Sequence, residues 1–67
     1  PGQVVGAMGT VVTVIQSGSL GEVNISVNGQ IVPYTAISED GESAFQVGTR
    51  VKVIRDLGDK VTVRRAL

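Results

Sequence analysis

Short stretches rich in valine and isoleucine alternate along the chain with glycine, asparagine, aspartate and serine. Val and Ile side chains are stiff at χ1 and suit pleated surfaces, and such runs between regular turn residues are typical of small barrels and sandwiches. The pattern predicts strands at residues 10–15, 22–27, 30–35, 50–55 and 60–64. We therefore expect an all-β chain, with at most a short helical turn between residues 36 and 47.

The strands at 22–27, 50–55 and 60–64 alternate cleanly between apolar and polar positions, so one face of each is predicted to be buried. The strand at 10–15 has apolar side chains on both faces, and we expect it to be bent or covered on both sides over part of its length. Gly6 and Gly9 precede it and suit a bend or a close backbone approach. The predicted core consists of Val12, Val14, Val23, Ile25, Val27, Val51, Val53, Val61 and Val63.

Turn residues define the connections between these strands. Asn28-Gly29 accepts positive φ at both positions and predicts a two-residue type I′ hairpin turn. Pro33 cannot donate to a ladder, so its strand is expected to lie at an edge or to be broken there. Gly41 is expected to turn the polar stretch 38–42, and residues 57–59 connect the last two strands.

Three strands, a connection and two further strands fit the five-stranded Greek-key barrel known as the OB-fold. Closing the sheet would remove exposed edges, which a small sheet must otherwise protect. The helix that usually precedes the fourth strand would be absent or reduced, and an SH3-like barrel is the main alternative. We expect one domain over residues 1–67 and, because the chain starts at Pro1 without an initiator methionine, a piece of a longer protein.

Composition excludes several kinds of chemistry. The 67 residues include no cysteine and no histidine, which removes disulfides, thiol nucleophiles, Cys/His zinc sites and the most frequent general base. Six basic residues balance six acidic ones, and a net charge of zero argues against binding nucleic acid through phosphate neutralisation. No apolar run approaches the ~20 residues of a membrane span. We therefore expect no catalytic residues, no cofactor and no metal.

Two clusters of polar residues could still carry chemistry. Glu39, Asp40 and Glu42 could offer oxygen ligands to a hard cation, but their spacing matches no calcium loop and a solvated loop is the better interpretation. A serine–lysine pair with Lys52 or Lys60 is conceivable. Both lysines alternate outward, where lysine stays solvated and charged, so this alternative is disfavoured.

A basic stripe stands above the background. Arg50, Lys52, Lys60 and Arg64 occupy outward positions of the last two strands and would share one surface if these strands pair. OB-folds bind single strands on such surfaces, but with aromatic stacking platforms, and the single Tyr and single Phe of the chain are not predicted to lie on this face. Contact with a partner protein or with anionic lipid headgroups is the candidate use, and a merely solvated face explains the stripe as well.

Several short motifs resemble the C-terminal soluble domain of NfeD-like membrane proteins. They are the opening Gly6-Ala7-Met8-Gly9-Thr10-Val11, the segment Tyr34-Thr35-Ala36-Ile37-Ser38-Glu39-Asp40-Gly41, the segment Val47-Gly48-Thr49-Arg50-Val51-Lys52-Val53, and the close Gly58-Asp59-Lys60-Val61-Thr62-Val63. The resemblance covers nearly the whole chain. It implies an OB-like barrel that follows several membrane spans, at the cell membrane and on its cytoplasmic side.

The resemblance also implies a function. Such proteins are typically encoded beside stomatin- or flotillin-like membrane proteins and act with them in organising membrane microdomains; longer members carry a protease domain to which no residue here corresponds. The expected function is a non-catalytic protein-interaction module with a stomatin- or flotillin-like partner. The alternative is an OB-type nucleic-acid or oligosaccharide-binding domain. Neutral net charge and scarce aromatic residues favour the first.

Overall fold

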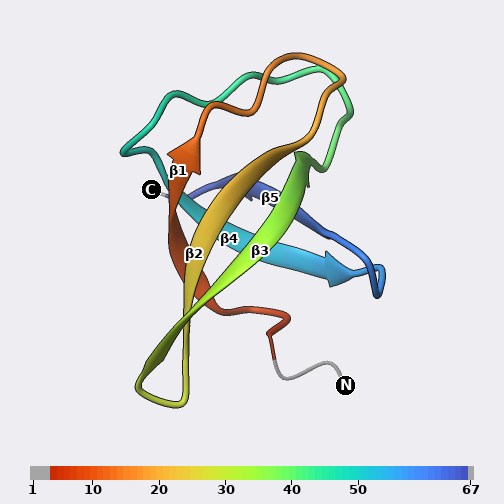
Figure 1. The fold of residues 1–67 in the computed structure, drawn as a ribbon. Coiled ribbons are helices and arrows are strands. Elements are labelled where there is room, and N and C mark those ends of the chain that lie inside the picture. The colour runs from red at the N-terminus through yellow and green to blue at the C-terminus, as the bar shows by residue number, and fades with distance from the viewer. Residues whose placement is uncertain (1–3, 67) are drawn as a thin grey trace.

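The computed structural model describes residues 4–66, which form five strands and no helix. The strands are β1 (Met8–Thr13), β2 (Gly21–Val27), β3 (Gln30–Ser38), β4 (Arg50–Asp56) and β5 (Val61–Arg65). They neighbour one another in the order β1-β2-β3-β5-β4, and β4 returns to β1, so the sheet closes into a barrel (Figure 1). Only β3 and β5 pair in parallel among these five strands. This confirms the predicted all-β, OB-like barrel.

The interior is filled by aliphatic side chains that every strand contributes. The alternation predicted for β2, β4 and β5 is confirmed, because every predicted inward residue except Val27 is completely buried. These are Val23, Ile25, Val51, Val53, Val61 and Val63, joined in the core by Val4, Val11, Ile15 and Ala36. Burial of each such side chain stabilises the fold by roughly 1.5–3 kcal/mol relative to exposure.

The core assignment was wrong at β1. Val12 is 42% exposed and Val14 is only partly buried, whereas Val11 and Ile15 are fully buried. The phase of β1 is the reverse of the predicted one, because Gly9 and Val11 stand opposite the buried Ile25 and Val23 of β2, and ordinary alternation then turns Val12 outward. A bulge follows, where the β1–β2 register shifts between Val11 and Thr13. The bulge ends the strand at Thr13, earlier than the predicted residue 15, and it provides the bend expected there.

The β2–β3 hairpin has the predicted two-residue turn. Val27 pairs with Gln30, and Asn28 and Gly29 have φ of 51° and 79°, as a type I′ turn requires. The hairpin extends beyond the body of the barrel (Figure 1), so Val27 is partly rather than fully buried.

Pro33 lies in the part of β3 that has a single neighbour. It stands opposite Asn24 of β2, while β5 contacts β3 only from Ala36 to Ser38. Residue pairs in an antiparallel ladder alternate between hydrogen-bonded and non-hydrogen-bonded positions. Val27 and Gln30 form the hydrogen-bonded pair next to the turn, so Asn24 and Pro33 form a non-hydrogen-bonded pair, and the nitrogen of Pro33 points away from β2. No ladder bond is therefore lost, which confirms the predicted edge position.

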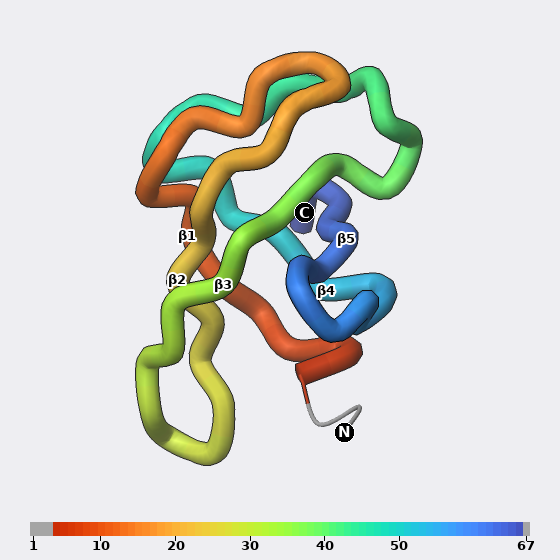
Figure 2. Tube along the Cα trace, turned by 45° about the vertical axis from the view of Figure 1, so that its right-hand side comes forward, coloured from red at the N-terminus to blue at the C-terminus, as the bar shows by residue number. Residues whose placement is uncertain are grey.

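The connection from Glu39 to Thr49 crosses one end of the barrel. It runs beside the loop that follows β1 (Figures 1 and 2), and Ile15 and Phe45 exchange backbone hydrogen bonds of 3.0 and 2.8 Å there. This stretch holds no helix, as predicted for the position where an OB-fold usually has one. Across residues 4–66 there is no helix of the length and apolarity needed to cross a bilayer.

Candidate functional site

The closed interior leaves any binding or chemistry to the outside of the barrel. Two surface depressions stand out in the described part of the chain. One, of about 120 Å³, is lined by the β3–β4 connection and the end of β5; the other, of about 210 Å³, is lined by Glu39, Ile54, Arg55 and Thr62. Ligand pockets in proteins are typically about 300–1,000 Å³, so both are small for a bound metabolite.

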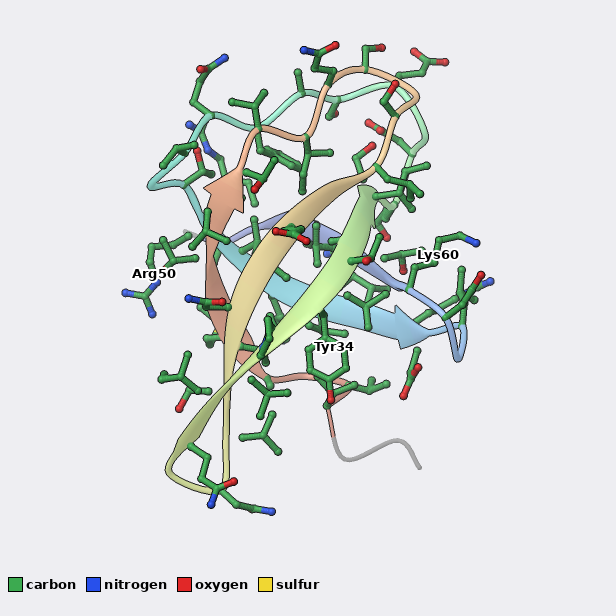
Figure 3. The ribbon with its side chains drawn as sticks, in the orientation of Figure 1. Tyr34, Arg50 and Lys60 are labelled. Carbon is green, nitrogen blue, oxygen red and sulfur yellow. The ribbon has the colours of Figure 1, made fainter. Side chains whose placement is uncertain are left out.

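The four basic residues of the predicted stripe do not form one surface. Lys52 and Arg64 are directly opposed across the β4–β5 pair, and Arg50 follows at the start of β4. Lys60 lies just before β5, and its Nζ forms a salt bridge of 3.5 Å with Oδ1 of the neighbouring Asp59. Figure 3 shows Arg50 and Lys60 on opposite sides of the barrel. The stripe therefore divides into a cluster of three residues and a separate lysine.

Arg64 is already paired within the molecule. Its Nε and Nη2 donate to Oε1 and Oε2 of Glu39 at 2.8 and 3.1 Å. This two-point contact raises the pKa of the Arg64 guanidinium above its ordinary value, through the hydrogen bonds first and the charge of Glu39 second. This ion pair joins basic strand β5 to the acidic β3–β4 connection. The two regions of opposite charge that the sequence indicated therefore meet at Arg64 and Glu39.

The acidic connection is organised around Asp40. Its Oδ1 accepts hydrogen bonds from Ser38 Oγ at 2.7 Å and from the backbone N–H groups of Glu42 and Ser43 at 2.8 Å. Its Oδ2 accepts one from Ser43 Oγ at 2.6 Å. The bonds from Ser43 and Ser38 hold the pKa of Asp40 well below its usual range. A carboxylate so fully engaged with its own loop is a turn former, and Gly41 beside it has the positive φ of 72° that the turn requires.

The two aromatic side chains pack inward. Tyr34 and Phe45 are partly buried and rest against the hydrophobic core. Since the chain has one Tyr, one Phe and no Trp, neither ring is left free as a stacking platform for bases or sugars. Among residues 4–66 no three Asp or Glu side chains gather closely enough to hold a metal ion.

Sequence reasoning missed an apolar patch beside the basic residues. Met8, Val12 and Val47 are 37%, 42% and 60% exposed. Met8 lies opposite Lys52 of β4, and Val12 and Val47 follow beyond the neighbouring pair of Thr10 and Arg50. We refer to Met8, Val12, Val47, Arg50 and Lys52 as the β1–β4 face. Val47 could have been noticed from the sequence, because it is a large apolar residue between Gln46 and Gly48 of a polar loop. Val12 could not, since apolar residues on both faces of β1 left the phase of this strand open.

Comparison with known proteins gives a consistent result. The family model described as the NfeD C-terminal domain matches residues 8–64. The solution structure of the soluble domain of the NfeD protein YuaF from Bacillus subtilis shares 28% identity over 90% of this chain and 70% of that one, with a TM-score of 0.76. The C-terminal domain of stomatin operon partner protein 1510-C from Pyrococcus horikoshii shares the fold, with 23% identity, coverage of 96% and 89%, and a TM-score of 0.76. No curated protein matches the chain.

Proposed function

The chain belongs to the NfeD family as its C-terminal domain, and we propose that it is a non-catalytic interaction module of a membrane protein. The observation that carries this proposal is the filled barrel: its interior is closed by aliphatic side chains, so recognition has to take place on its outer surface. NfeD proteins are membrane proteins with a soluble domain, which gives such a surface a membrane setting.

The proposed partner is a stomatin- or flotillin-like membrane protein, with which the domain acts in organising membrane microdomains. The structural relative from Pyrococcus horikoshii is named a stomatin operon partner protein, which supports this choice. The proposal places the domain on the cytoplasmic side of the cell membrane as part of a longer protein. Of the predicted interaction residues Arg50, Lys52, Lys60 and Arg64, we retain the first two as contact residues, since Lys60 and Arg64 are engaged by Asp59 and Glu39.

The alternative is an OB-type nucleic-acid or oligosaccharide-binding domain, which the barrel architecture would permit. The inward packing of Tyr34 and Phe45 argues against it, because single-strand binders rely on exposed aromatic rings. Balanced charge adds to this argument.

The test is a pair of titrations at physiological salt. The chain is titrated with the soluble part of a stomatin-like protein from the same organism, and separately with a single-stranded oligothymidylate. Saturable binding to the protein with no more than weak binding to the oligonucleotide supports the proposal. Sub-micromolar binding to the oligonucleotide with none to the protein overturns it in favour of the alternative.

A further inference from the structure

Exposed apolar residues concentrate on one strand pair of the barrel. Of the seven large hydrophobic residues that are exposed in the described part of the chain, three belong to the β1–β4 face: Met8, Val12 and Val47. Singly exposed hydrophobic residues are ordinary, whereas a contiguous group marks an interaction surface.

The register places Met8 and Val12 along one line, with Val47 beside its end. Met8 and Val12 both point outward from β1, with Thr10 between them. Val11 accepts a hydrogen bond from the N–H of Gly48 and donates one to the oxygen of Thr49, each at 2.9 Å. Because the two segments run antiparallel, the residue after Val11 and the residue before Gly48 are neighbours, so Val47 lies beside Val12.

Two cations flank this apolar line on its β4 side. Lys52 is the cross-strand partner of Met8, and Arg50 is the partner of Thr10. Both are exposed, and neither takes part in the ion pairs found within residues 4–66, which join Lys60 to Asp59 and Arg64 to Glu39. On the β2 side the outward residues are Ser26, Asn24 and Glu22, and Glu22 pairs with Thr13 and accepts a hydrogen bond from its Oγ1 at 3.3 Å. The face is thus apolar along its centre, positive on its β4 flank, and uncharged or negative on its β2 flank.

We propose that the β1–β4 face is the docking site for an amphipathic segment of the protein partner, with apolar side chains along its centre and carboxylates along one edge. The apolar line takes the apolar side chains out of water, and Arg50 and Lys52 pair with the carboxylates. The difference in charge between the two flanks also fixes the direction in which such a segment lies, because the reversed orientation would leave its carboxylates beside Asn24 and Glu22. This inference rests on the proposed function and specifies the surface that performs it.

The experiment compares matched variants for binding to the soluble part of a stomatin-like protein from the same organism. Val12→Asp places a carboxylate in the apolar line, and Leu57→Asp is its control, because Leu57 is 48% exposed but lies in the β4–β5 turn. Lys52→Glu reverses a flanking charge, and Lys60→Glu is the control on the opposite side of the barrel. Circular dichroism and thermal midpoints verify that all four variants fold.

We expect Val12→Asp and Lys52→Glu to weaken binding about tenfold or more, as truncation of central interface residues does, and the two controls to change it by less than about twofold. Affinity of the parent should fall with added salt, and that dependence should be smaller for Lys52→Glu. If the parent binds and all four folded variants bind equally well, the surface is misassigned while the proposed function stands. If the parent does not bind, the proposed function itself fails.

Vesicles with and without anionic lipid supply the last comparison. If a protein segment occupies the β1–β4 face, the parent should not bind anionic vesicles through Lys52. The proposal is overturned if the parent binds anionic vesicles in a salt-dependent way, Lys52→Glu abolishes that binding, and Val12→Asp binds the partner protein as the parent does. A lipid surface rather than a protein segment would then occupy the β1–β4 face.

Discussion

Gly9 is a position at which even the smallest possible substitution should damage the barrel. It is buried in β1 opposite Ile25 of β2. A Cβ at this position would overlap the backbone oxygen of Asn24 and lie 2.5 Å from Cδ1 of Ile25. Favourable carbon contacts begin near ~3.5 Å, so β1 and β2 would have to separate by roughly 1 Å at the centre of their ladder.

The cost follows from these contacts. Overpacking a core typically costs about 1–3 kcal/mol, and an obstacle made of backbone lies toward the upper end because it cannot rotate away. Alanine lowers the entropy of the unfolded chain and recovers about 0.4–1 kcal/mol. We therefore expect Gly9→Ala to lose about 2 kcal/mol net, against a total stability of about 3–5 kcal/mol for a core of this size.

Urea denaturation followed by circular dichroism measures this loss, and a double-mutant cycle with Ile25→Val identifies its source. Valine lacks the Cδ1 atom that Gly9→Ala would strike, so Ile25→Val should cost about 0.5–1.5 kcal/mol in the parent and less in the Gly9→Ala background. A Gly9→Ala variant within about 0.5 kcal/mol of the parent would refute the close approach of the two strands.

Three further predictions test the core, the acidic connection and its ion pair. Ile25→Ala should cost about 2–5 kcal/mol in urea denaturation and Ile31→Ala less than about 0.5, because Ile25 is fully buried and Ile31 is 65% exposed; equal costs would contradict the strand phase. The pKa of Asp40 is lowered on folding, so the ionised carboxylate stabilises the fold fully above its unfolded pKa of about 4, and this stabilisation is lost as pH falls towards the folded pKa. The difference in unfolding free energy between the parent and Asp40→Ala should therefore be constant near pH 7 and shrink below about pH 4. A cycle of Glu39→Gln and Arg64→Gln should give a coupling below about 1 kcal/mol that decreases with salt, since both side chains are substantially exposed; a coupling that salt leaves unchanged would contradict this.

Sequence patterns predicted the fold well where the side-chain period was unambiguous. In β2, β4 and β5 a valine or isoleucine alternates with a polar residue, and a one-residue slip would expose all of them, so the register is strongly specified. The Asn28-Gly29 turn fixed the β2–β3 pairing in the same way, because few other pairs accept positive φ at both positions.

β1 shows why alternation alone was insufficient. Residues Val11 to Ile15 are β-branched at every position, so neither face of the strand was marked as polar. The phase was decided instead by the pairing of Gly9 and Val11 with the buried Ile25 and Val23 of β2. This pairing places Val11 in the core and Val12 on the surface, which is the reverse of the prediction.

The candidate site was predictable only in part, because it depends on the closure of the barrel. Outward positions for the basic residues followed from alternation. The pairing of Arg64 with Glu39 joins residues 25 positions apart in the chain, and no local pattern indicates it. The neighbourhood of Lys52 and Met8 likewise exists only because β4 closes on β1.

The most direct test of the account is a nuclear magnetic resonance titration of the ¹⁵N-labelled chain with the soluble part of a stomatin-like protein from the same organism. The account predicts that the largest amide shift changes lie on the β1–β4 face, at Met8, Val12, Val47 and Lys52, while the exposed edge of β3 around Ile31 changes little. Shift changes centred on β3, or on the depression beside Phe45, with none on the β1–β4 face would contradict it.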